Sequence, residues 1–140
     1  MAVRNAQATW EGSLKDGQGT MKFGSFSGPF SYASRFEDGI GTNPEELLGA
    51  AHAGCFSMAL SSGLGRAGFT PQRIQTVANV HLERVDGKTR ITRIHLETLA
   101  QAPGISNDQF QAIAEETKAG CPVSAALAGV TITLTAQLVS

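Results

Sequence analysis

TNPEELLGAAHAGCFSMAL, residues 42–60, is the stretch that decides the fold. Asn43 is a good N-cap, Pro44 suits the first helical position, and Glu46 stands three residues after the cap as a capping-box partner. These features predict a long helix that begins at Pro44 and stops before Gly68, where a glycine can adopt the left-handed conformation. Apolar side chains cover most of its circumference, so we expect the helix to be buried.

Short segments that alternate apolar and polar residues precede this helix. We expect three strands there, at residues 6–10, 19–23 and 30–36. Lys15-Asp16-Gly17 and Ser27-Gly28-Pro29, which are typical turn sequences, separate them.

After the helix, the alternation continues on both sides of Asp86-Gly87, which predicts a long hairpin. Ser106 caps a second helix that Gly120 closes, Cys121-Pro122 starts a short helix, and residues 130–139 alternate as a last strand. The order predicts a single α+β domain over residues 1–140, with about six strands in one antiparallel sheet.

The long helix needs cover that one sheet cannot supply. A sheet covers one face of a helix, and this helix is apolar on nearly all sides. Because two-fold dimers are the commonest closed assembly, we expect a homodimer in which two such helices pack together.

Composition excludes several classes of protein. The chain has 140 residues, 41% of them apolar, and a net charge of −1 with scattered Lys and Arg, so neither disorder nor binding to nucleic acid or an anionic membrane is expected. The apolar region around residues 47–64 is interrupted by His52, serines and glycines, which favours a core helix over a membrane span. No secretory signal is recognisable at the N-terminus, and we expect a cytoplasmic protein.

The two cysteines, Cys55 and Cys121, are 121 − 55 = 66 residues apart, which excludes a C-x-x-C motif. Cys121 stands at the expected N-cap of a helix, where free N–H groups favour a thiolate, whereas Cys55 lies inside a helix and needs a charge from elsewhere, for which Arg35 is the candidate. On pattern alone, both could equally be small core residues.

The histidines give no metal site. His52 and Cys55 supply two ligands where a structural zinc needs four, and only distant residues such as Cys121 with His81 or His95 could complete the set. His52 fits a helix residue held by a local partner better than a general base, and the other two fit sheet positions.

Two motifs together resemble a known family. Residues 42–60 resemble the central motif of the OsmC/Ohr family of organic hydroperoxide reductases, and Ala119-Gly120-Cys121-Pro122-Val123-Ser124 resembles its second cysteine motif. The resemblance runs from Trp10-Glu11-Gly12 through Ser34-Arg35-Phe36-Glu37 to the last strand. An arginine on the strand before the long helix resembles the OsmC branch more than the Ohr branch.

This resemblance implies an antiparallel sheet wrapped around the long helix in an intertwined homodimer with two composite active sites. It implies a thiol peroxidase that acts on organic hydroperoxides, and less efficiently on hydrogen peroxide, with no bound cofactor and an external dithiol such as a lipoyl group as reductant. By position, Cys55 resembles the peroxidatic cysteine, Cys121 the resolving cysteine, Arg35 the cation that stabilises the thiolate and the peroxide, and Glu45 the acid that orients Arg35.

The spacing of Glu45 and Cys55 limits how these residues could meet. Ten residues of straight helix span about 15 Å. Either the helix breaks early, near Gly49, or Glu45 reaches the site from the partner chain, which we favour because the buried helix already requires a dimer.

Two other functions remain open on the sequence. One is a non-catalytic redox-sensing stress protein or thiol-dependent chaperone, and the other is a binding domain for small ligands or acyl thioesters. Phe36, Phe56, Met58 and Phe69 could form an apolar mouth for organic substrates, although such residues are more often plain core.

Overall fold

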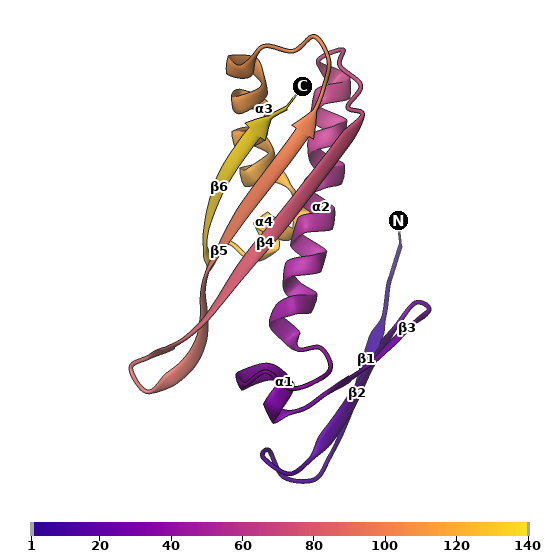
Figure 1. Cartoon of the computed structure of the whole chain (residues 1–140), viewed down its shortest axis with the longest axis vertical. Helices are drawn as coiled ribbons and strands as arrows, with labels where there is room; N and C mark the ends of the chain where they lie inside the picture. The colour runs from indigo at the N-terminus through magenta and orange to yellow at the C-terminus, as the bar shows by residue number, and fades with distance from the viewer. Residues whose placement is uncertain (1, 140) are drawn as a thin grey trace. The chain divides into compact units, whose positions relative to one another are not determined.

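The computed structural model describes residues 2–139, and its chain forms two compact units, one up to Leu47 and one from Leu48 onward. In chain order the elements are β1, β2, β3, α1, α2, β4, β5, α3, α4 and β6 (Figure 1). The α+β class is as predicted. The strands form two three-stranded sheets, however, where the sequence led us to expect one sheet of about six strands.

The first sheet is an antiparallel meander of β1 (Ala6–Glu11), β2 (Gln18–Phe23) and β3 (Phe26–Phe30). The expected turn at Ser27-Gly28-Pro29 is wrong, because these residues lie within β3. The chain turns instead at Gly24, which has a φ of 54°. Pro29 is tolerated opposite Thr20 because β3 is an edge strand of this sheet.

Arg35 lies on a short helix, α1 (Tyr32–Phe36), so its placement on a strand is also wrong. The cause is a capping box that alternation does not reveal. The backbone N–H of Ser34 donates to Ser31 Oγ at 3.1 Å, and the backbone N–H of Ser31 donates to Ser34 Oγ at 2.8 Å.

The long helix α2 (Pro44–Arg66) begins where the sequence predicts. The backbone N–H of Glu46 donates to Asn43 Oδ1 at 2.8 Å, and Gly68, with a φ of 93°, follows the C-terminus. The predicted alternative of a break near Gly49 is wrong, since the helix is continuous there. A Cβ at Gly49 would stand 3.4 Å from the carbonyl oxygen of Ala78, so this glycine permits a close approach to a strand.

The second sheet has the order β4 (Arg73–Val85), β5 (Lys88–Gln101) and β6 (Thr131–Leu138). Asp86 and Gly87 have positive φ and form the predicted hairpin turn. The pairing of β5 with β6 is parallel, which corrects the expectation of a purely antiparallel sheet. The helices α3 (Asn107–Gly120) and α4 (Pro122–Ala126) form the crossover that a parallel pair requires.

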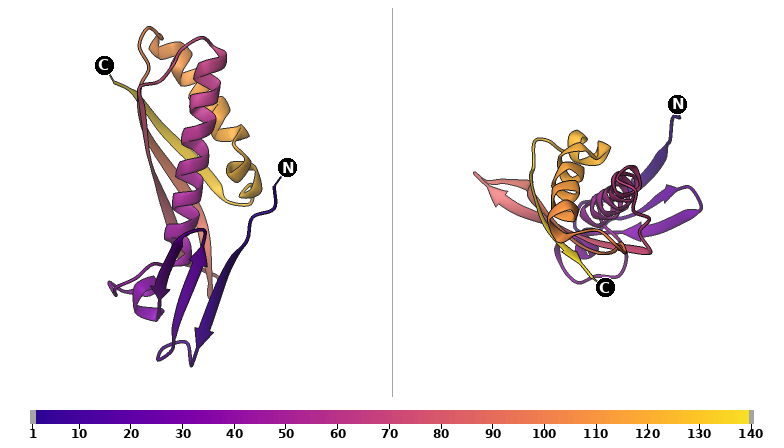
Figure 2. Two further views of the ribbon diagram at one scale, coloured as in Figure 1. Left: turned by 90° about the vertical axis from the view of Figure 1, so that its right-hand side faces the viewer. Right: turned by 90° about the horizontal axis from the view of Figure 1, so that it is seen from above.

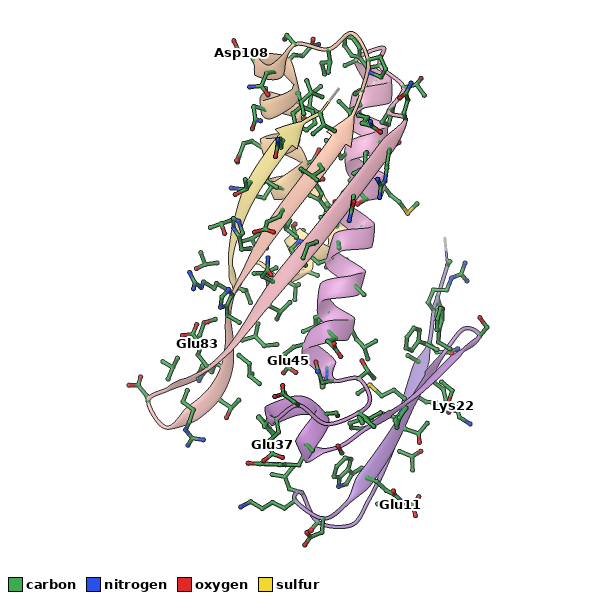
Figure 3. The ribbon with its side chains drawn as sticks, viewed as in Figure 1. Glu11, Lys22, Glu37, Glu45, Glu83 and Asp108 are labelled. Carbon is green, nitrogen blue, oxygen red and sulfur yellow. The ribbon has the colours of Figure 1, made fainter. Side chains whose placement is uncertain are left out.

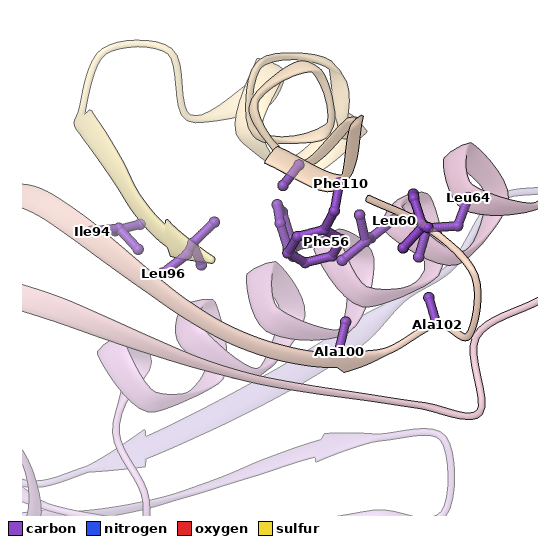
Figure 4. Packing of buried hydrophobic residues seen from close by; sticks show 10 residues of the cluster. Phe56, Leu60, Leu64, Ile94, Leu96, Ala100, Ala102 and Phe110 are labelled. Atoms are coloured by element: carbon purple, nitrogen blue, oxygen red, sulfur yellow. The ribbon is translucent and has the colours of Figure 1, made fainter. Parts of the chain in front are cut away.

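The core of the second unit lies between this sheet and its helices. In Figure 2, α2 and α3 lie on the same face of the sheet. His52, Phe56, Leu60 and Leu64, spaced four residues apart on α2, are fully buried, and the apolar ones join Ile94, Leu96 and Phe110 in the core (Figure 4).

The opposite face of α2 is exposed. It carries Met58, whose exposed fraction is 77%, among small residues at Ala51, Gly54 and Ser61. By length and composition α2 is also apolar enough to cross a membrane, but its buried stripe is typical of the core helix of a folded domain.

Candidate active site

The two cysteines lie together although they are far apart in the sequence. Cys55 is in the middle of α2, and Cys121 caps α4. Both are free thiols. Burial raises the pKa of each, and the interaction between the two side chains raises the pKa of Cys55 further and lowers that of Cys121. The fold therefore brings the two predicted cysteines to one place in the second unit, while their joining as a disulfide stays a prediction.

Cys121 is held as the sequence predicts, at a helix N-terminus. Its backbone is extended, its side chain accepts the backbone N–H of Ser124 at 3.3 Å, and Pro122 follows at the first helical position. Burial by itself raises the pKa of Cys121. Hydrogen bonds from the side chain and backbone of Ser124, from Cys55 and from the backbone N–H of Val123 outweigh burial, so the pKa lies below its ordinary value.

Cys55 has the opposite electrostatic environment. Burial raises its pKa, and the hydrogen bond and charge of Cys121 raise it further, against one lowering contact from the backbone N–H of Val123. No Lys, Arg or His side chain within residues 48–139 is among the groups that shift the pKa of Cys55. The resting second unit therefore favours the thiolate on Cys121, and the expectation that Cys55 needs a charge from elsewhere agrees with this environment.

His52 contacts this cluster from one helical turn before Cys55. Its Nε2 lies 2.7 Å from Ser124 Oγ, and Ser124 Oγ lies 3.3 Å from the sulfur of Cys121. The ring is fully buried, and burial lowers its pKa. The expectation of a local partner for His52 is wrong, because its partner, Ser124, lies on α4, 72 residues away.

Arg35 and Glu45 form an ion pair within the first unit. The Nη2 of Arg35 donates to Glu45 Oε1 at 2.7 Å, and its Nε lies 3.1 and 3.3 Å from the two carboxylate oxygens. Figure 3 labels Glu45 at the start of α2. The carboxylate is buried and fixes the plane of a guanidinium whose side chain is 36% exposed, so the cation is oriented yet accessible.

An apolar cavity of about 230 Å³ borders Arg35 in the same unit. Trp10, Phe30, Tyr32 and Phe36 supply its aromatic lining. Only Phe36 of the four residues expected to form an apolar mouth is among them, because Phe56 is fully buried, Phe69 packs against the core and Met58 is exposed. Alternation identified the other three aromatic residues only as strand positions.

A second, more polar cavity of about 570 Å³ reaches Cys121 between α2 and α3. Arg66 and Glu116 line it, one charge of each sign. Residues 2–139 contain no group of three or more His, Cys, Asp or Glu side chains that could hold a metal ion.

One known protein family matches most of this chain. A family model described as OsmC-like protein matches residues 37–135. The chain belongs to the OsmC family. It is 50% identical over 140 residues to Peroxiredoxin OsmC of Escherichia coli K12, covering 98% of this chain and 97% of that protein, and equally identical to the protein of the same name from Shigella flexneri.

Solved structures share the OsmC fold over nearly the whole chain. An OsmC-like protein from Mycoplasma pneumoniae has a TM-score of 0.78 at 16% identity and covers 99% of both chains. An organic hydroperoxide resistance protein from Legionella pneumophila has a TM-score of 0.73 at 21% identity and covers 98% of this chain and 99% of its own. At these identities the likeness concerns the fold alone.

Proposed function

We propose that this OsmC-family chain is a thiol-dependent peroxidase that reduces organic hydroperoxides to alcohols, and hydrogen peroxide less efficiently to water. The observation that carries the proposal is that the fold brings the side chains of Cys55 and Cys121 together, so that each shifts the pKa of the other. A peroxidatic cysteine needs a second thiol within reach before over-oxidation, and this pair supplies one.

The proposed reaction has three steps. The thiolate of Cys55 attacks the terminal oxygen of the hydroperoxide, the O–O bond breaks, and the alkoxide leaves as alcohol after taking a proton, which leaves Cys55 as a sulfenic acid. The thiol of Cys121 then displaces the hydroxyl group as water and forms the Cys55–Cys121 disulfide. An external dithiol, such as a lipoyl group, reduces this disulfide and becomes a disulfide itself.

Arg35 and Glu45 are proposed to serve the first step. A guanidinium beside the sulfur of Cys55 would lower the raised pKa of this thiol and hydrogen-bond the peroxide oxygens. The ion pair with Glu45 supports this role because it holds the guanidinium in one plane. The apolar cavity beside Arg35 suits the organic part of a hydroperoxide.

We further propose that residues 1–140 act as one OsmC-like domain in a cytoplasmic, intertwined homodimer, and that the partner chain's Arg35 and Glu45 complete each cysteine site. Supporting this, the face of α2 around Met58 is exposed in one chain, and two-fold packing would cover it. A solution mass of twice 14.6 kDa is expected, and a mass of one chain would contradict the dimer.

The test is loss of cumene hydroperoxide with dihydrolipoamide as reductant. Turnover that disappears in Cys55→Ser supports the peroxidase. Undiminished loss with both cysteines replaced would reject it, and protection of a denaturing client protein without any turnover would favour the chaperone. Comparison of hydrogen peroxide with alkyl hydroperoxides under the same dithiol measures the substrate preference.

A further inference from the structure

Ser124 contacts the sulfur of Cys121 through two groups: its backbone N–H donates to the sulfur, and the Cys121 thiol donates to its hydroxyl, which can donate in return once the sulfur is a thiolate. Its backbone N–H and its hydroxyl both lie 3.3 Å from the sulfur. Cys121 and Ser124 are 1% and 4% exposed, so water does not compete for these contacts. Each hydrogen bond to a buried thiolate is stronger than the same bond at a protein surface, and such bonds offset the cost of burying the charge.

The hydroxyl of Ser124 has one proton and two neighbours. It can donate either to the sulfur of Cys121 or to Nε2 of His52, 2.7 Å away on the other side. If His52 Nε2 carries a hydrogen, it donates to Ser124 Oγ, and the hydroxyl proton is then directed to the sulfur. If Nε2 carries no hydrogen, it accepts the hydroxyl proton of Ser124, and the sulfur of Cys121 loses a hydrogen-bond donor.

The environment of His52 favours the first arrangement. The ring is 0% exposed, and burial lowers its pKa, so it is neutral and carries a single N–H. In the part of the chain that the structure describes, Nδ1 of His52 is the one buried side-chain nitrogen or oxygen without a hydrogen-bond partner. A ring hydrogen on Nδ1 would be a buried donor without an acceptor, whereas a hydrogen on Nε2 is satisfied by Ser124.

We propose that His52 is a positioning residue for the resolving thiol: its Nε2–H fixes the orientation of the Ser124 hydroxyl so that Ser124 donates to the thiolate of Cys121. This rests on the proposed function for its catalytic meaning, but the hydrogen-bond chain can be tested without turnover. In that function, a stabilised Cys121 thiolate is available to attack the sulfenic acid of Cys55. It is also a better leaving group when the dithiol reduces the disulfide.

Other charged groups around Cys121 are few. Arg66 of α2 and Glu116 of α3 line the adjoining cavity with opposite signs, and α4 contains no charged residue. Among the groups that shift the pKa of Cys121, Cys55 is the one whose own side chain titrates. A titration of Cys121 should therefore be made with Cys55 replaced by serine, which keeps a polar side chain at that position.

The experiment follows thiolate absorbance of Cys121 against pH in the Cys55→Ser protein. Adding Ser124→Ala or His52→Leu should move the midpoint to higher pH. Adding His52→Gln instead should leave the midpoint near that of the Cys55→Ser protein, because the Gln amide can donate from a position near that of Nε2. The matched control Ser57→Ala, which removes a hydroxyl of α2 bonded to Thr76, should titrate like the Cys55→Ser protein.

The proposal is overturned if Ser124→Ala titrates like the Cys55→Ser reference, or if a folded His52→Gln protein behaves like Ser124→Ala. Should His52→Leu fail to fold, Ser124→Ala and His52→Gln still decide the outcome. With Cys55 intact, Ser124→Ala should slow disulfide formation about three-fold at a pH below the thiol midpoint. The reason is that loss of about ten-fold in thiolate is partly offset by higher intrinsic nucleophilicity.

Failure of the proposed function would look different. If Cys55 never forms a sulfenic acid, no disulfide step is measured at all, while the titration of Cys121 still reports the hydrogen-bond chain.

Discussion

The guanidinium of Arg35 donates through two of its nitrogens to the carboxylate of Glu45, with its Nη2 2.7 Å from Oε1 and its Nε 3.1 Å from the same oxygen. The ring of Phe36 lies 5.3 Å from the guanidinium carbon. These contacts hold a planar cation in one orientation at the border of an apolar cavity.

Glu45→Gln should lower kcat/KM for cumene hydroperoxide about ten-fold or more, because a neutral amide holds the guanidinium less firmly than a carboxylate. Steady-state kinetics at saturating dithiol measure the effect. The matched control is Glu46→Gln, at the next position on α2, which should change kcat/KM little. Equal losses in both variants would mean that the first turn of α2 matters only for stability.

Mixed dimers test whether Glu45 acts across the two-fold axis. A dimer with Glu45→Ala on one chain and Cys55→Ser on the other should keep one working site, and so about half of the wild-type rate per dimer. Each parent homodimer should be nearly inactive. If the mixed dimer is as inactive as its parents, Glu45 does not serve the partner's cysteine.

Met58→Glu should weaken the dimer, because it places a charge on the exposed apolar face of α2 that the partner is proposed to cover. Light scattering should then give a mass near that of one chain, where the wild type gives twice that mass. The variant should remain folded by circular dichroism, since Met58 makes no part of the core. An unchanged dimer would place the interface elsewhere.

The buried ring of His52 should make folding sensitive to acid. Its pKa is lowered in the folded protein, so above the ordinary value of 6.5 the ring is neutral in both states and its stabilisation is fully present. As the pH falls, the unfolded chain binds a proton that the folded chain excludes, and the free energy of unfolding decreases. Urea unfolding of reduced protein at pH 7 and pH 5.5 should show this decrease, and His52→Gln should lose less. Equal losses in both proteins would contradict the argument.

Local signals predicted the fold well where a short motif determines the structure. Asn43-Pro44 and Asp86-Gly87 set a helix start and a hairpin turn through their own conformational preferences, and both are where the sequence placed them. Arg35 was misplaced because alternation concealed the Ser31 cap. The parallel pairing of β6 was missed because the direction of β6 relative to β5 is set by the crossover through α3 and α4.

Local sequence signals likewise predicted only part of the candidate site. The N-cap position of Cys121 could be predicted because Cys121-Pro122 is a local signal. The contact of His52 with Ser124 could not, since it joins residues 72 apart and depends on how α4 packs against α2. The aromatic lining beside Arg35 was likewise hidden, because it gathers residues from β1, β3 and α1.

One measurement tests the central claim most directly: the reduced protein is treated with one equivalent of cumene hydroperoxide per chain, and its thiols and peptide linkages are analysed. The account predicts that both thiols are lost, that Cys55 and Cys121 are joined by a disulfide, and that Cys121→Ser instead accumulates a sulfenic acid on Cys55. Hydroperoxide consumed at the wild-type rate by Cys55→Ser, or both thiols left free after the wild type has consumed its equivalent, would contradict it.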